Sequence, residues 1–158
     1  MAEIVNEDGT AQLKASIEVL DSVRGGMVSH GSAFLNAMMG VVRARVSFWI
    51  GDRAFVTREV YLHQMSVRSW AKQVSALVQG ELDRDEIAWG AESPELLINL
   101  RRFDVGDHAR YEMTIALDVS ALADEGVTGE GPGLLLMPEA EAVVQFADDL
   151  LAETAACL

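Results

Sequence analysis

An amphipathic pattern between residues 66 and 80 constrains the fold more than any other feature of this sequence. Apolar side chains recur there at the three- and four-residue spacing of one helix face: Val67, Trp70, Ala71, Val74, Leu77 and Val78. We expect the Ser66 hydroxyl to cap the amino end of this helix, and Gly80 to end it in the left-handed conformation. Because a one-sided helix has to bury its apolar stripe, we expect it to pack on a sheet built from the flanking segments.

Alternating apolar and polar residues predict three strands before this helix. The alternation runs through residues 13–19, 42–50 and 54–62. The Gly51-Asp52 pair between the last two runs is typical of a tight hairpin turn. Residues 1–10 are expected to be frayed.

Further strands are predicted after the helix. Residues 87–89 and 133–137 are short apolar runs, a strand begins at Pro94 and reaches Phe103, and residues 111–119 alternate strictly. A final amphipathic helix is predicted after Pro138, which suits a first helical turn. Residues 21–40 and 120–133 contain several glycines and lose the periodicity, so we expect flexible loops there.

This order of elements predicts a single α+β domain over residues 1–158. The order is βββαββββα, and runs of strands joined by turns favour antiparallel pairing. We therefore expect a twisted antiparallel sheet of about six or seven strands, with two amphipathic helices packed on one face.

Composition indicates a cytoplasmic protein. The sequence has one cysteine, Cys157, and no apolar run near the roughly 18 residues that cross a membrane. Its amino end is acidic and lacks the basic start of a signal peptide.

The net charge of −13 is concentrated in the last third of the chain. Residues 111–158 hold 10 acidic side chains and no basic one, so a basic footprint for nucleic acid is absent there. The acids either keep a solvated face soluble or steer a basic protein partner toward it. The outward side of the final helix supplies the candidate partner-binding residues: Glu141, Asp148, Asp149 and Glu153.

No pattern in the sequence identifies a reaction. None of the three histidines pairs with another His or Cys at metal-ligand spacing. The segment 104–108 holds Asp and His, but it is typical of a hairpin turn rather than a metal site. The glycine-rich segment 129–133 lacks the Lys or Arg of a phosphate-binding loop. We therefore expect no catalytic residue, no cofactor and no metal, and a protein that is not an enzyme.

A second candidate surface lies on the predicted hairpin 42–62. Trp49 shares a strand face with Arg43 and Arg45, so it either packs on a second layer or belongs to an exposed contact patch. Arg43, Arg45 and Arg58 are expected to give one face of the hairpin a basic character.

Five segments have a characteristic order along the chain: the run 53–60, the helix closing in Gln79-Gly80-Glu81, the strand with Trp89, the run 96–100 and the turn 106–108. Together with the order of elements over roughly residues 10–155, they resemble small bacterial immunity proteins of the WapI type and related actinobacterial domains of unknown function. Loop 21–40 is longer than in that family. The resemblance implies a protein that binds and neutralises a cognate toxin, with no catalytic residues to carry over.

Two functional hypotheses follow for this chain. The first is a non-enzymatic, immunity-type binding protein that masks a toxin domain, which could be a basic one. The alternative is a self-associating structural or assembly module, for example in a phage or another multi-subunit particle. Free sheet edges and the apolar Met and Phe of the glycine-rich segments motivate the alternative.

Overall fold

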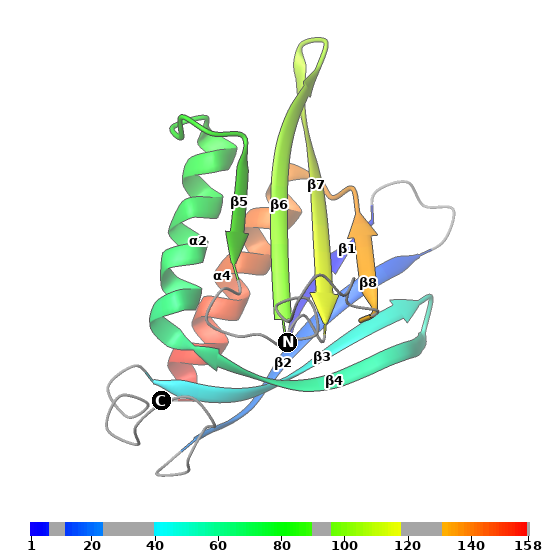
Figure 1. Ribbon diagram of the computed structural model, residues 1–158, viewed down its shortest axis with the longest axis vertical. Coiled ribbons are helices and arrows are strands. Elements are labelled where there is room, and N and C mark those ends of the chain that lie inside the picture. The colour runs from blue at the N-terminus through cyan, green and yellow to red at the C-terminus, as the bar shows by residue number, and fades with distance from the viewer. Residues whose placement is uncertain (7–11, 24–39, 90–95, 118–130, 158) are drawn as a thin grey trace, which may run out of the picture.

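The chain folds into two antiparallel four-stranded sheets, each followed by one long helix (Figure 1). The computed structural model describes residues 1–6, 12–23, 40–89, 96–117 and 131–157. The first half contains β1 (Ala2–Val5), β2 (Leu13–Ser22), β3 (Val41–Ile50), β4 (Arg53–His63) and α2 (Gln64–Gln79). The second half contains β5 (Glu86–Trp89), β6 (Leu96–Val105), β7 (His108–Leu117), β8 (Gly133–Leu136) and α4 (Ala140–Ala156).

The α+β class and the antiparallel pairing are confirmed, but the prediction of a single sheet of six or seven strands is wrong. Strands β1 to β4 form the first sheet and β5 to β8 form the second, and each strand pairs with the next along the chain. The element order is ββββαββββα, because Ala2–Val5 form β1 rather than a frayed end. Ala2 and Ile4 alternate with exposed neighbours and are fully buried against the core, which fixes this short strand.

The expectation that both helices pack on one face of one sheet is wrong. Helix α4 packs on β1 and β2 of the first sheet, whereas α2 contacts β5 of the second sheet and the end of β4. Both helices also pack on each other, and one hydrophobic cluster joins buried residues from both sheets and both helices. Apolar periodicity identifies a buried helix face, but it does not specify which of two sheets covers that face.

The termini of α2 match the prediction at one end only. Gly80 ends the helix with a φ of 73°, and its N–H donates to the carbonyl oxygen of Leu77 at 3.2 Å. The amino end differs, because His63 occupies the capping position without a side-chain bond and Ser66 lies inside the helix.

The predicted hairpin turns are confirmed. Gly51 and Gly106 take φ values of 61° and 63° in two-residue turns that join β3 to β4 and β6 to β7. The predicted loops are described only at their ends. Residues 21–22 belong to β2 and Gly133 begins β8, and most of the remainder, residues 24–39 and 120–130, lies outside the described residues.

Candidate protein-binding surface

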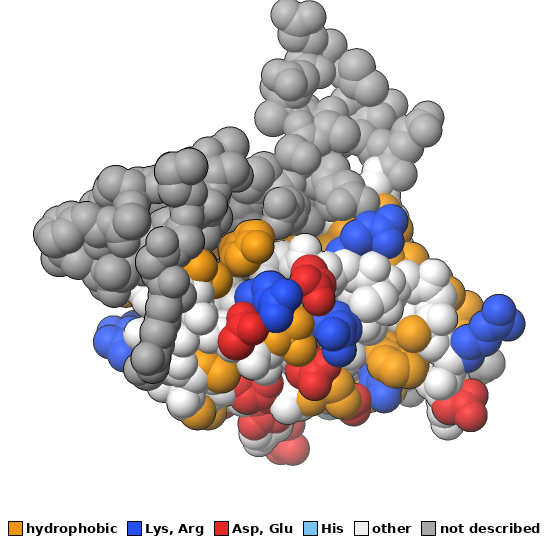
Figure 2. All heavy atoms as spheres, turned by 90° about the horizontal axis from the view of Figure 1, so that it is seen from below, with side chains coloured by type: hydrophobic (Ala, Val, Ile, Leu, Met, Phe, Trp, Pro, Cys, Tyr) orange, Lys and Arg blue, Asp and Glu red, His pale blue; other side chains and the backbone are white. Residues whose placement is uncertain are grey.

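The first sheet has one face on the core and one face on solvent. Its inward residues, such as Ile17, Val46 and Leu62, are fully buried beneath the helices and the second sheet. We call the other side the outer face; it carries Glu3, Lys14, Ser16, Glu18, Asp21, Arg43, Arg45, Ser47, Trp49, Thr57, Glu59 and Tyr61. Figure 2 views the molecule from this side and shows charged side chains of both signs interleaved with hydrophobic ones.

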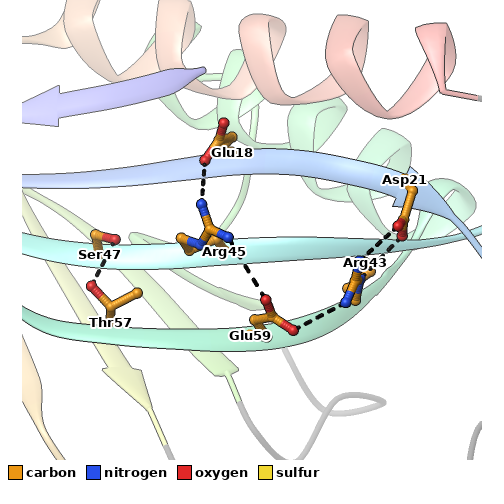
Figure 3. A network of polar contacts seen from close by, with 7 residues as sticks. All are labelled: Glu18, Asp21, Arg43, Arg45, Ser47, Thr57 and Glu59. Carbon is orange, nitrogen blue, oxygen red and sulfur yellow. Dashed lines mark hydrogen bonds and ion pairs between the residues drawn. The ribbon is translucent and has the colours of Figure 1, made fainter.

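Arg43 and Arg45 lie on the outer face as predicted, and each arginine is held by two carboxylates (Figure 3). Arg43 donates to Asp21 at 2.7 and 3.1 Å and to Glu59 at 3.4 Å. Arg45 donates to Glu18 at 3.1 Å and approaches Glu59 at 3.8 Å. Glu59 therefore bridges the two arginines, and the network runs across three strands.

Trp49 is half-buried on the same face, beside the arginine network. Its Nε1–H donates to the Ser16 hydroxyl at 2.9 Å, and the Lys14 ammonium lies 5.0 Å from the centre of its ring. These contacts fix the ring while leaving part of its surface exposed. Trp49 thus lies on the solvent-facing side of the sheet and not in the core formed by the described residues.

A hollow of about 300 Å³ opens on the outer face between Trp49 and Arg45. Ser16 and Ser47 form part of its lining and are only 2% and 5% exposed, although they point away from the core. The Ser47 hydroxyl lies 3.2 Å from that of Thr57, so the polar groups of the lining are already paired.

The expected basic character of the hairpin is wrong. A bulge between Phe48 and Trp49 shifts the pairing with β4 by one residue, so that Glu59, and not Arg58, lies opposite Arg45. Arg58 pairs with the inward residue Val46 and lies on the other face. The outer face carries three basic and four acidic side chains, and all seven of them form ion pairs.

The Asp21–Arg43 pair gives a pH-dependent signature of this network. The hydrogen bond from Arg43 lowers the pKa of the Asp21 carboxyl and raises that of the guanidinium, although the pair is exposed. An acid whose pKa falls on folding stabilises the folded state above its unfolded pKa of about 4. That contribution is lost as the pH falls through the lower, folded pKa of Asp21.

We therefore expect Arg43→Gln to raise the pKa of Asp21 toward its ordinary value. An NMR titration of the side-chain carboxyl carbon measures this directly. The matched control is Arg45→Gln, which removes a neighbouring arginine that does not contact Asp21 and should leave that midpoint in place. An Asp21 midpoint unchanged by Arg43→Gln would show that the pair does not form in solution.

The acids of α4 do not form one uniform outward row. Glu141 and Asp148 are exposed, and Asp149 is half-buried and accepts a hydrogen bond from Gln145 at 2.6 Å. Glu153 is only 24% exposed, because its carboxylate lies against β1 and β2. It accepts the Val19 N–H at 3.5 Å and pairs with the amino group of Met1. Glu153 is thus a structural contact, and the other three acids remain available.

One edge of the first sheet is formed by β4, which pairs only with β3 within the described part of the chain. Its backbone is partly protected, since the Arg58 guanidinium donates to the Thr57 carbonyl oxygen at 2.9 Å. Charged side chains on an edge strand disfavour pairing with a further strand.

No group of three His, Cys, Asp or Glu side chains in residues 1–6, 12–23, 40–89, 96–117 or 131–157 lies close enough to hold a metal ion. The segment 104–108 is confirmed as a hairpin turn between β6 and β7. In the same part of the chain, neither helix has the length and apolar character needed to cross a bilayer.

Comparisons with known proteins assign no family to this chain. No protein-family model matches the sequence, and no curated protein matches it. Among solved structures, the crystal structure of WHY1 from Arabidopsis thaliana aligns over 98% of this chain and 80% of that chain, with 11% identity and a TM-score of 0.34. A likeness of that degree carries no argument about fold or function.

Proposed function

We propose that this protein is a non-enzymatic, immunity-type bacterial binding protein that masks a cognate toxin domain. The outer face of the first sheet supplies the contact surface in this proposal, with Trp49, Arg43 and Arg45 at its centre. The resemblance of the element order to small immunity proteins supplies the class of partner.

The proposal rests on one observation: the charged side chains of the outer face already form ion pairs with one another in the unbound protein. Binding costs free energy when long side chains must be ordered and when charges lose water without gaining a partner. Arg43 and Arg45 are each held between two carboxylates, so both costs are reduced. Arginine and tryptophan are also among the residues that most often dominate binding energy in protein interfaces.

The alternative function, a self-associating assembly module, would use the open edge of β4. Its eleven residues could pair with a strand of another copy. However, the Arg58 guanidinium already donates a hydrogen bond to the Thr57 carbonyl oxygen in the middle of that edge. This observation favours the masking function over assembly through β4.

The proposal is tested by presenting the purified protein to toxin domains encoded beside its gene. We expect one of them to bind with a dissociation constant below about 1 μM, and equimolar protein to abolish the activity of that domain. Interferometry measures the binding and the toxicity assay measures the masking. If no neighbouring domain bound at micromolar concentration, or if binding left the toxic activity intact, the proposal would be contradicted.

A further inference from the structure

The outward surface of the two helices differs from the outer face of the first sheet in how its charges are arranged. Arg68 and Lys72 are exposed on α2, and Glu141 and Asp148 are exposed on α4. None of these four side chains forms an ion pair or a side-chain hydrogen bond with another residue that the structure describes. They remain available to a partner, whereas the charges of the outer face are already paired.

The two signs are separated by helix. Between Gln64 and Gln79, α2 carries only basic charges, and between Ala140 and Ala156, α4 carries only acidic ones. The helices lie side by side and run in opposite directions (Figure 1). A uniformly basic partner would be attracted to α4 and repelled by α2. A fitting partner therefore presents an acidic strip beside a basic one.

A second copy of this chain has that arrangement. A two-fold axis parallel to the helices places α2 of one copy on α4 of the other, so that unlike charges meet. A two-fold axis across the helices would place α2 on α2 and α4 on α4, so that like charges meet. Charge therefore selects the first of these two arrangements.

The heights of the residues along the helices specify which side chains meet. Val78 borders the same hollow, of about 390 Å³, as Ala140 and Val144, so these residues are level. Both helices rise about 1.5 Å per residue, and they run in opposite directions. The level of Val78 on α2 therefore corresponds to residue 142 of α4, midway between Ala140 and Val144. Lys72 lies six residues before Val78, and Asp148 lies six residues after residue 142, so Lys72 and Asp148 are level. An axis parallel to the helices keeps these heights, so Lys72 of each copy faces Asp148 of the other.

We propose that α2 and α4 form a self-association surface, on which two copies of this chain pair through reciprocal Lys72–Asp148 contacts about a two-fold axis parallel to the helices.

The contact surface is small. Two helices of 16 and 17 residues are about 25 Å long and lie about 10 Å apart, which gives roughly 500 Å² per copy. Stable interfaces bury about 800 Å² per partner. The dimer is therefore weak and becomes populated only at high micromolar protein concentration. It leaves the outer face of the first sheet open.

Sedimentation velocity of the full chain from about 10 μM to 1 mM at low salt tests this. We expect a concentration-dependent monomer–dimer equilibrium that weakens at about 0.5 M salt, since screening shortens the reach of the charges. Lys72→Glu and Asp148→Lys should each weaken dimerisation about tenfold, because each change puts like charges together at both symmetric contacts. Asp107→Lys changes the same charge on the distant β6–β7 turn and should leave the dimer unchanged.

Mixing the two single variants separates this contact from an ion pair within one chain. In a mixed dimer, Glu at position 72 of one copy meets Lys at position 148 of the other, and the second contact is the original Lys72–Asp148 pair. We therefore expect the 1:1 mixture to regain dimerisation to within about threefold of the original protein. A protein that stays monomeric at 1 mM, a dimer indifferent to both reversals, or a mixture no stronger than its components would each overturn the proposal. Circular dichroism confirms that each variant is folded.

Discussion

Replacing Trp70 with alanine should lower the free energy of unfolding by about 3–5 kcal/mol. The side chain is 1% exposed and lies where the two halves of the fold meet. Its ring stacks on Trp89 of β5 at 5.3 Å between centroids and meets the edge-on ring of Phe146 of α4 at 6.1 Å. Because three elements converge on this ring, they cannot close the cavity that alanine leaves without moving together and disturbing their other core contacts. Urea melts with a common slope measure the loss.

Two further variants make this result interpretable. Trp70→Phe keeps an aromatic ring, and the Nε1–H that it removes has no hydrogen-bond partner among the described residues. We therefore expect a smaller loss than for alanine. Arg68→Ala, on the exposed side of the same helix, should change stability by no more than about 0.5 kcal/mol. A loss below about 1 kcal/mol for Trp70→Ala would mean that α2 does not bury this face.

Local patterns predicted the elements better than they predicted how the elements assemble. The stripe from Val67 to Leu77 and the stop at Gly80 depend on neighbours within a few turns, so the sequence was sufficient to place α2. The division into two sheets depends on whether the strands before α2 pair with the strands after it. That choice is made by long-range packing, such as the Trp70–Trp89 stack, which the order of elements does not encode.

A single backbone irregularity explains the largest error at the candidate site. With a two-residue turn at Gly51-Asp52 and regular pairing, Arg58 would lie opposite Arg45 and the face would be basic. The bulge beside Trp49 adds one residue to β4, brings Glu59 opposite Arg45 and makes the face nearly neutral. Bulges have no reliable signal in a single sequence.

Other parts of the site came from strands that are distant along the chain. Ser16 and Glu18 belong to β2, and their contacts with Trp49 and Arg45 need the β2–β3 register. The strict alternation of both strands offered the only signal for these contacts. Glu153 was misplaced for a related reason, because helix periodicity does not show that β1 and β2 lie against that flank of α4.

Trp49→Ala should weaken binding of the cognate domain about 30-fold or more. Central aromatic residues of protein interfaces typically contribute at least 2 kcal/mol, which corresponds to about that factor. The ring borders the hollow beside Arg45, and it is already held by Ser16 and Lys14. Its removal therefore takes away a surface that needs no further ordering on binding. Calorimetric titration of the toxin domain found in the binding screen measures the change.

The matched control for this change is Leu135→Ala. Leu135 is an exposed hydrophobic residue of β8 in the second sheet, away from the outer face of the first. We expect its replacement to leave the affinity within about threefold, because surface changes away from an interface have small effects. Equal losses for Trp49→Ala and Leu135→Ala would indicate a general loss of folded protein rather than a lost contact.

The most direct test of the outer face as the binding surface uses the three tryptophan indole N–H signals in an NMR titration with that toxin domain. Trp49 lies on the outer face, whereas Trp70 is buried in the core and stacks on the half-buried ring of Trp89, away from that face. We expect the Trp49 signal to shift or broaden in proportion to the bound fraction, while the Trp70 and Trp89 signals stay in place. An unchanged Trp49 signal at saturation would contradict the account and would place the binding surface elsewhere on the molecule.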